Sequence, residues 1–249
     1  YWSIQHEDLI NRHMLVNGTS GSGKTTAVNQ IVKELFRQGH HIVYLDFSHS
    51  CTPKQLASHG IEETFQKDNI LRSRLESVLE NPEELTSALE IVQEENSILL
   101  FETETYSDEV ESFLTLLYEK VSEREELEIF LVIDEVHELN YAKGSPLYCI
   151  MEMGRRNGIS LISIFQGPHQ TKPKQYSMMN QSDIKLIFKL TDHKDAEDVA
   201  KSDALKPPGK FIEKIRKLAK HHCLVIGNLE DSDGELENDR FVEVTVPEI

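Results

Sequence analysis

An eight-residue segment near the amino terminus constrains the fold more than any other feature of the chain. Residues 18–25 are GTSGSGKT and match the pattern G-x-x-x-x-G-K-[ST]. The segment follows the apolar run His13–Asn17 and precedes a stretch whose apolar residues recur at helical spacing. Strand, glycine loop and helix in this order form a phosphate-binding loop. A glycine turn that matches by chance is the alternative, and the flanking strand and helix argue against it.

The chemistry of this segment indicates how it would hold a nucleotide. Glycines let the backbone turn its N–H groups toward phosphate oxygens, and the helix amino terminus adds partial positive charge. We expect the Lys24 ammonium to reach the β- and γ-phosphates and the Thr25 hydroxyl to bind Mg²⁺. The expected nucleotide-binding residues are Gly18, Thr19, Ser20, Gly21, Ser22, Gly23, Lys24, Thr25 and Thr26.

Two adjacent carboxylates end a second apolar run. Ile129–Ile133 is purely apolar, as expected for a parallel strand buried on both faces, and Asp134 and Glu135 follow it. At this strand end we expect Asp134 to hold the Mg²⁺ shell and Glu135 to act as general base on the attacking water. A strand that simply reaches solvent would look the same, but the phosphate loop favours the nucleotide site. Glu135 predicts hydrolysis and disfavours a small-molecule kinase.

A third strand carries polar residues at both ends. The turn Gly154–Gly158 (GRRNG) precedes Ile159–Phe165, and Gln166 follows. Because open α/β sheets bind ligands at the carboxyl ends of their strands, Gln166 is a candidate to contact the γ-phosphate or the water. Arg155 or Arg156 could act across a subunit boundary as an arginine finger. A basic turn beside a solvated glutamine explains the same spacing, so both interpretations stay open.

The rest of the chain alternates short β-like runs with helical stretches, which predicts an α/β fold with a mainly parallel sheet flanked by helices. We predict one domain over residues 1–249, with residues 52–95 as a possible helical insertion in which Pro53 and Pro82 begin helices. The further expected strands are His41–Asp46, Ser97–Phe101, Ile184–Phe188, Cys223–Ile226 and Phe241–Val246.

Together these motifs resemble the HerA/FtsK superfamily of DNA-pumping ATPases, nearer to the HerA branch. GTSGSGKT, IFLVIDEVHEL and GRRNGISLISIFQ carry the resemblance, which covers roughly residues 11–226. It implies a RecA-like P-loop core of the ASCE type, ATP and Mg²⁺ as cofactors, a hexameric ring, and translocation along double-stranded DNA or its unwinding. It also implies that Gln166 senses the γ-phosphate and that an arginine of the GRRNG turn serves the neighbouring active site.

Two other functions use the same motifs. A regulatory ATPase that gates a partner such as a nuclease would need the same residues, since these concern ATP and not DNA. The letters DEVH also occur in two-domain helicases, but 249 residues cannot hold a second RecA-like domain. Many members of the superfamily carry a domain before the ATPase core. Because Tyr1 stands only 17 residues before Gly18, we expect the carboxyl-terminal part of a longer protein.

Charge and composition limit the partners. The net charge of −17 argues against binding nucleic acid over the whole surface. DNA contacts are therefore expected at local lysines, each of which could instead belong to a solvated basic face. The candidates are Lys172 and Lys174 in one loop and Lys210, Lys214, Lys217 and Lys220 near a late helix. No disulfide or metal pattern of cysteines, signal peptide or membrane-spanning run is visible, which predicts a cytoplasmic protein without a membrane partner.

Overall fold

A nine-stranded sheet runs through the residues described in this computed structural model, which are 11–47, 70–95, 97–103, 108–124, 126–166, 176–202, 208–227 and 241–246. The strands are β1 (Met14–Asn17), β2 (His41–Asp46), β3 (Ile70–Ser73), β4 (Ile98–Glu102), β5 (Ile129–Ile133), β6 (Ile159–Phe165), β7 (Ile184–Phe188), β8 (His222–Ile226) and β9 (Phe241–Thr245). Their order is β3-β4-β2-β5-β6-β1-β7-β8-β9. Strands β1 to β7 are parallel. At one end of the sheet β8 pairs antiparallel to β7, and β9 pairs antiparallel to β8. The predicted mainly parallel α/β fold is confirmed.

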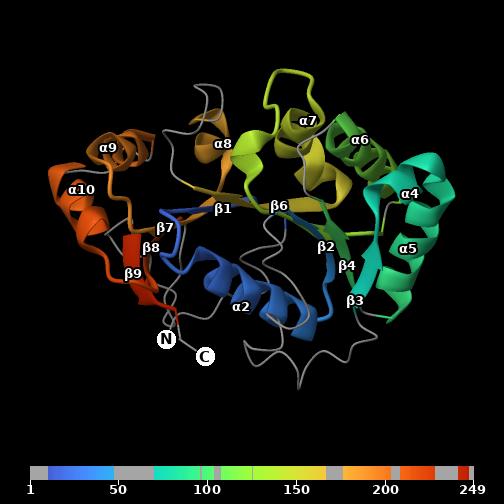
Figure 1. The fold of residues 1–249 in the computed structure, drawn as a ribbon, viewed down its shortest axis with the longest axis horizontal. Coiled ribbons are helices and arrows are strands. Elements are labelled where there is room, and N and C mark those ends of the chain that lie inside the picture. The colour runs from blue at the N-terminus through green and yellow to red at the C-terminus, as the bar shows by residue number, and fades with distance from the viewer. Residues whose placement is uncertain are drawn as a thin grey trace.

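Helices cover both faces of this sheet, as Figure 1 shows. They are α2 (Lys24–Arg37), α4 (Leu75–Glu80), α5 (Pro82–Glu95), α6 (Asp108–Ser122), α7 (Pro146–Met153), α8 (Tyr176–Gln181), α9 (His193–Ser202) and α10 (Pro208–Lys217), with short 3₁₀ turns η3 (Val136–Glu138) and η4 (Gly154–Asn157). Helix α2 lies under the sheet in that view, and α6, α7 and α8 lie above it. None of the helices in the described ranges is long and apolar enough to cross a membrane.

Successive side chains of each strand contribute to two hydrophobic cores, one on each face of the sheet. In β1, Met14 and Val16 pack with the apolar side of α2, whereas Leu15 joins the core under the opposite helices. In β5, Phe130 and Val132 likewise face α2 while the residues between them face away. Successive side chains of a strand point to opposite faces, so a strand between two helical layers is apolar at most of its positions. The purely apolar run predicted at Ile129–Ile133 is therefore a central strand.

The segment expected as a helical insertion differs from its prediction. Ile70–Ser73 forms strand β3, which pairs in parallel with β4 at the edge of the main sheet. Helix α5 does begin at Pro82, as predicted, while Pro53 lies outside the described residues. An edge strand pairs on one side only, and the side chains of β3 are mostly half-buried. The segment therefore contains polar residues, and its sequence does not differ clearly from that of the neighbouring helices. Residues 70–95 thus belong to the sheet and its helical layer.

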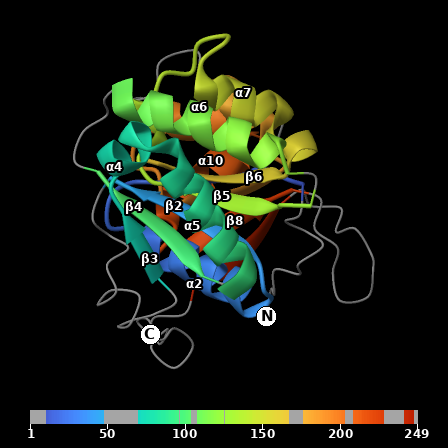
Figure 2. The same ribbon diagram turned by 90° about the vertical axis from the view of Figure 1, so that its right-hand side faces the viewer.

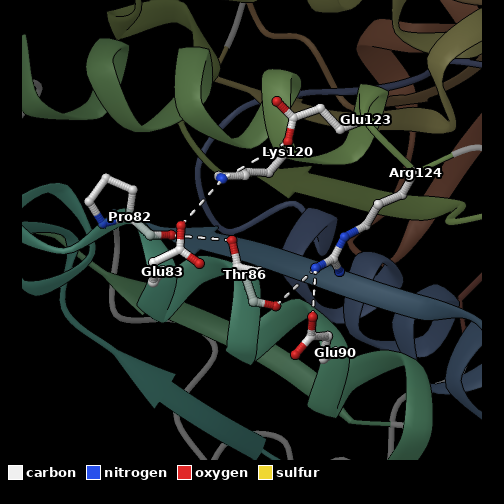
Figure 3. Close-up of polar contacts among 7 residues, drawn as sticks. All are labelled: Pro82, Glu83, Thr86, Glu90, Lys120, Glu123 and Arg124. Carbon is white, nitrogen blue, oxygen red and sulfur yellow. Dashed lines mark hydrogen bonds and ion pairs between the residues drawn. The ribbon is translucent and has the colours of Figure 1, made fainter.

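Polar contacts fasten α5 to α6 at that edge (Figure 3). The Arg124 Nη2 atom donates to the Thr86 carbonyl at 3.3 Å and to Glu90 Oε1 at 3.1 Å. Lys120 Nζ lies 3.9 Å from Glu83 Oε1. Such partly exposed ion pairs contribute about 0–1 kcal/mol each, so buried apolar residues of both helices supply most of the stability. Figure 2 shows this edge, with α5 beside β3 and β4 and α6 above them.

Candidate active site

The phosphate loop lies where the sequence predicts it, between the carboxyl end of β1 and the amino terminus of α2. Gly23, at the amino-terminal cap of α2, has φ +108°, and a Cβ there would lie 2.9 Å from Nδ1 of His221. Conformation and space both require glycine at this position. The first N–H groups of a helix have no partner within it, so the start of α2 offers donors to a ligand above the strand ends.

Lys24 is buried in this loop. Its Nζ donates to the Gly18 carbonyl at 2.8 Å and to the Thr19 carbonyl at 3.1 Å. Burial lowers the pKa of Lys24, and the nearby Glu135 and Asp134 carboxylates oppose that change. The ammonium is thus held above the loop by carbonyls that phosphate oxygens can replace.

The two predicted carboxylates follow β5 and lie beside the phosphate loop. In the sheet, β6 is the single strand between β5 and β1. Asp134 is only 3% exposed, and its Oδ1 accepts a hydrogen bond of 3.0 Å from the Glu135 N–H. Glu135 has φ 51°, in the left-handed region that residues other than glycine rarely adopt. This sharp turn directly after β5 brings both carboxylates to the same edge as Lys24.

Glu135 is held between two side chains. Gln166, directly after β6, donates a hydrogen bond from its Nε2–H to Glu135 Oε1. On the other side, His137 Nδ1 lies 3.3 Å from Glu135 Oε2 without the geometry of a hydrogen bond, and burial lowers the pKa of His137. Burial raises the pKa of Glu135 to about 7, with repulsion from Asp134 adding to the increase and Lys24 opposing it. A carboxyl that titrates near neutral pH suits a general base.

A cavity of about 370 Å³ joins these groups. Its lining residues are Ser20, Gly21, Gly23, Lys24, Thr25, Thr26, Asp134, Glu135, Gln166, Lys220 and His221. The last two were not predicted for this site. Lys220 was a candidate for a DNA-binding face, and His221 was not a candidate for any site. Both lie in a turn before β8. The sequence carries no signal for their position, because it depends on how β8 joins the sheet.

The two candidate arginines lie at the opposite edge. Arg155 and Arg156 are in η4, before β6, whereas Gln166 follows that seven-residue strand. At about 3.3 Å per residue, β6 separates them from the cavity by roughly 20 Å. Arg155 Nη1 also lies 2.9 Å from Asp183 Oδ2, while Arg156 is exposed. Neither arginine reaches the cavity of its own chain, so only a role in a neighbouring subunit stays open as a prediction.

A family model described as an AAA domain matches residues 10–169, more than half of the chain. The chain belongs to this AAA domain family. The matched range includes the phosphate loop, Asp134, Glu135 and Gln166, and the chain is accordingly an ATP-binding P-loop ATPase domain. No curated protein sequence matches this AAA domain.

Solved structures share the fold of this AAA domain at low identity. The genome packaging NTPase B204 from Sulfolobus turreted icosahedral virus 2, in complex with ATP-gammaS, has a TM-score of 0.61 and 13% identity, covering 94% of this chain and 96% of that one. VirB4 of Thermoanaerobacter pseudethanolicus has a TM-score of 0.61 and 12% identity, covering 95% and 89%. The plasmid coupling protein TrwB, with ADP and Mg²⁺, has a TM-score of 0.59 and 12% identity, covering 98% and 86%. The resemblance to the HerA/FtsK superfamily is confirmed for the P-loop family and the fold.

Proposed function

We propose that this domain hydrolyses Mg²⁺-bound ATP to drive movement along double-stranded DNA as one subunit of an oligomeric ring. The observation that carries the proposal is the single cavity that unites Lys24, Thr25, Asp134, Glu135 and Gln166. Structural neighbours whose names describe a genome packaging NTPase and a plasmid coupling protein support the DNA part. A cytoplasmic location and a single domain over residues 1–249 belong to the same proposal.

The cavity residues divide the hydrolytic reaction among them. Lys24 exchanges the carbonyls of its loop for phosphate oxygens, and the α2 N–H groups bind the same phosphates. Glu135 orients a water oxygen for attack on the γ-phosphorus and takes its proton as the bond to ADP breaks. Gln166 contacts Glu135 and fixes the direction of its carboxylate.

The donor groups of the cavity fit Mg²⁺. Thr25 and Asp134 both line it, and Mg²⁺ is usually bound through one or two protein oxygens together with substrate phosphates and water. In the described ranges no group of three or more His, Cys, Asp or Glu residues could hold a metal ion. Phosphate oxygens and water would therefore supply the other ligands of Mg²⁺ at this site. When bound, Mg²⁺ neutralises negative charge on the β- and γ-phosphates.

An arginine supplied by a neighbour would complete the site in a ring. Arg156 is the better candidate, since it is exposed and Arg155 is paired with Asp183. It lies at the sheet edge opposite its own phosphate loop. In a head-to-tail ring each interface joins two different surfaces, so one subunit can present this edge to the cavity of the next.

Arg156→Ala is expected to lower ATPase activity by about 10³-fold or more, because an arginine finger stabilises charge in the transition state. Mixing this variant with Lys24→Ala should restore activity that neither has alone, since the Lys24→Ala subunit keeps its arginine for the intact cavity of its neighbour. Random mixing of equal amounts would recover about a quarter of the unsubstituted rate in a head-to-tail ring. A Lys24→Ala and Glu135→Gln mixture is the matched control, because both changes damage the same cavity. Absence of recovery in the Arg156→Ala mixture would assign Arg156 to another role.

The lysines proposed for DNA contact fall into separate places. Lys172 and Lys174 lie outside the described residues. On α10, Lys214 Nζ is 3.1 Å from Glu243 Oε2, whereas Lys210 is exposed and Lys217 is paired with Glu213 of the same helix. Lys210 and Lys217 are therefore the described lysines of this set best placed for phosphates of DNA.

Double-stranded DNA is expected to stimulate ATP hydrolysis at low salt, and the stimulation should fade as salt rises. The double variant Lys210→Ala/Lys217→Ala should weaken DNA binding and lower the slope of log affinity against log salt by up to about 1.8, that is about 0.9 for each lost phosphate contact. Lys201→Ala removes the same kind of charge from a pair on α9 and should leave the slope unchanged. Hydrolysis indifferent to DNA would favour the alternative, an ATPase that gates a partner protein such as a nuclease.

A further inference from the structure

A turn from the carboxyl-terminal part of the chain reaches the nucleotide cavity. Residues 218–221 connect α10 to β8, and Lys220 and His221 line the cavity beside the phosphate loop. Strand β8 runs antiparallel to β7, so its amino end lies at the edge where the parallel strands have their carboxyl ends. Figure 1 shows α10 and β8 at this end of the sheet, beyond β1 and β7.

The turn is fastened to the phosphate loop through His221. The His221 N–H donates to the Ser22 carbonyl at 2.9 Å, and the His221 carbonyl accepts from the Val246 N–H at 2.7 Å. His221 has φ 63°, and its ring and Cα fill the space beside Gly23, where a Cβ would lie 3.1 Å from the His221 Cα. The turn and the loop therefore hold each other in place, and Lys220 has a fixed attachment point next to the helix amino terminus.

Lys220 differs from the other basic residues nearby. Lys24 donates to loop carbonyls, and Lys214 and Lys217 are paired with glutamates. Lys220 is exposed at the cavity wall and forms no hydrogen bond or ion pair with any residue in the described ranges. Its ammonium is available to an anion that enters the cavity.

The charges of the cavity show what such an anion would be. Asp134 and Glu135 oppose Lys24 on the side of β5 and β6, where Gln166 also lies. Lys220 enters from the other side of β1, the side of β7 and β8. Because Glu135 and Gln166 mark the end at which the γ-phosphate reacts, the opposite wall faces the part of the polyphosphate that is not transferred.

We infer that Lys220 is a second nucleotide-binding cation, which contacts the α- and β-phosphates from the turn that His221 anchors to the phosphate loop. The inference rests on ATP binding at this loop, as in the proposed function. Lys220 is then no longer a candidate for contact with DNA, as the lysine spacing had indicated, because it lines the nucleotide cavity.

The test is nucleotide affinity of Lys220→Ala, measured by titration with ATP and with ADP in the absence of DNA. One lost charge-assisted hydrogen bond predicts that both affinities fall by about tenfold. At saturating ATP the turnover rate should fall less than the affinity does, since the α- and β-phosphates are present in both ATP and ADP. Lys220→Arg, which keeps the charge, should recover most of the affinity. Lys201 is an exposed lysine on α9, and Lys201→Ala, the control variant, should bind ATP and ADP as tightly as the unsubstituted protein does.

The outcomes separate this inference from the proposed function. Unchanged affinities of Lys220→Ala beside a weakened Lys24→Ala would overturn the inference alone. Unchanged affinities of both variants would overturn the proposed ATP site as well. A loss confined to ATP would also contradict the inference, since it would place Lys220 at the γ-phosphate. Lys220→Glu should give a larger effect that is easier to measure, because reversing the charge should reduce the affinities for ATP and ADP further than Lys220→Ala does.

Discussion

Replacing Glu135 by glutamine is expected to slow ATP hydrolysis by about 10²- to 10⁴-fold while leaving ATP bound. The amide has nearly the shape of the carboxylate but cannot accept the proton of the attacking water. Lys24, Thr25 and the α2 N–H groups, which would hold the phosphates, are unchanged in this variant. Single-turnover hydrolysis and an ATP titration on the same preparation measure the two properties separately.

Glu138→Gln is the matched control for this variant. Glu138 follows three residues later, is half-exposed, and its Oε1 lies 3.4 Å from Nε2 of His137. It does not line the cavity, so its loss should change turnover by only a few-fold. Normal turnover by Glu135→Gln would remove Glu135 from the role of base, and an equal loss in both variants would show that the local charge matters more than the proton acceptor.

The pH dependence of the unsubstituted protein offers an independent check on Glu135. Burial and the neighbouring Asp134 raise the pKa of Glu135 to about 7, so the carboxyl is protonated and unable to act as a base below that pH. The ratio kcat/KM, which reports the free protein, should therefore rise with pH through about 7. A flat profile between pH 6 and 8 would contradict the assignment.

The second large effect is expected for Lys24→Ala, which should lower ATP affinity by about 10- to 100-fold. The variant removes the ammonium group that donates hydrogen bonds to the Gly18 and Thr19 carbonyls of the loop. Those carbonyls cannot bind phosphate, and Lys220 lies on the other wall of the cavity, so neither replaces the contact that Lys24 makes. ATP titration measures the loss, and Lys201→Ala provides the surface control. Unchanged ATP affinity would show that the nucleotide does not bind at this loop.

Folding should survive the Lys24→Ala substitution. Lys24 is buried, and burial lowers its pKa, which means that the charged form is disfavoured in the folded protein without a ligand. Removing it therefore takes away an unfavourable charge along with two hydrogen bonds. The thermal unfolding midpoint should change little, and ATP should raise the midpoint of the unsubstituted protein more than that of the variant.

Much of the sheet could be predicted because its strands carry strong local signals. The runs Ile159–Phe165 and Ile184–Phe188 have the bounds that the sequence predicts, since mostly apolar segments of this length mark strands covered on both faces. The loop around Lys24 and the carboxylates after β5 were also placed correctly. Each of these features depends on residues adjacent in the chain, so the sequence contains the information.

Edge strand β3 was missed for the opposite reason. It pairs with β4 on one side only, and Ile70–Ser73 therefore needs no apolar pattern that would distinguish it from the helices beside it. The helices α7, α8 and α9 were also not predicted separately, because they are short and their apolar residues complete a core that other elements begin.

The sequence by itself determined the phosphate loop, the strand that ends in Asp134 and Glu135, and the parallel α/β class, since short-range backbone conformation and burial decide all three. Only the tertiary structure decided which distant groups share the cavity. It brought Lys220 and His221 to the loop through the reversed direction of β8, and it placed Arg155 and Arg156 at the opposite edge. Those positions follow from strand order and direction, which arise from contacts between segments far apart in the chain and leave no pattern in the residues themselves.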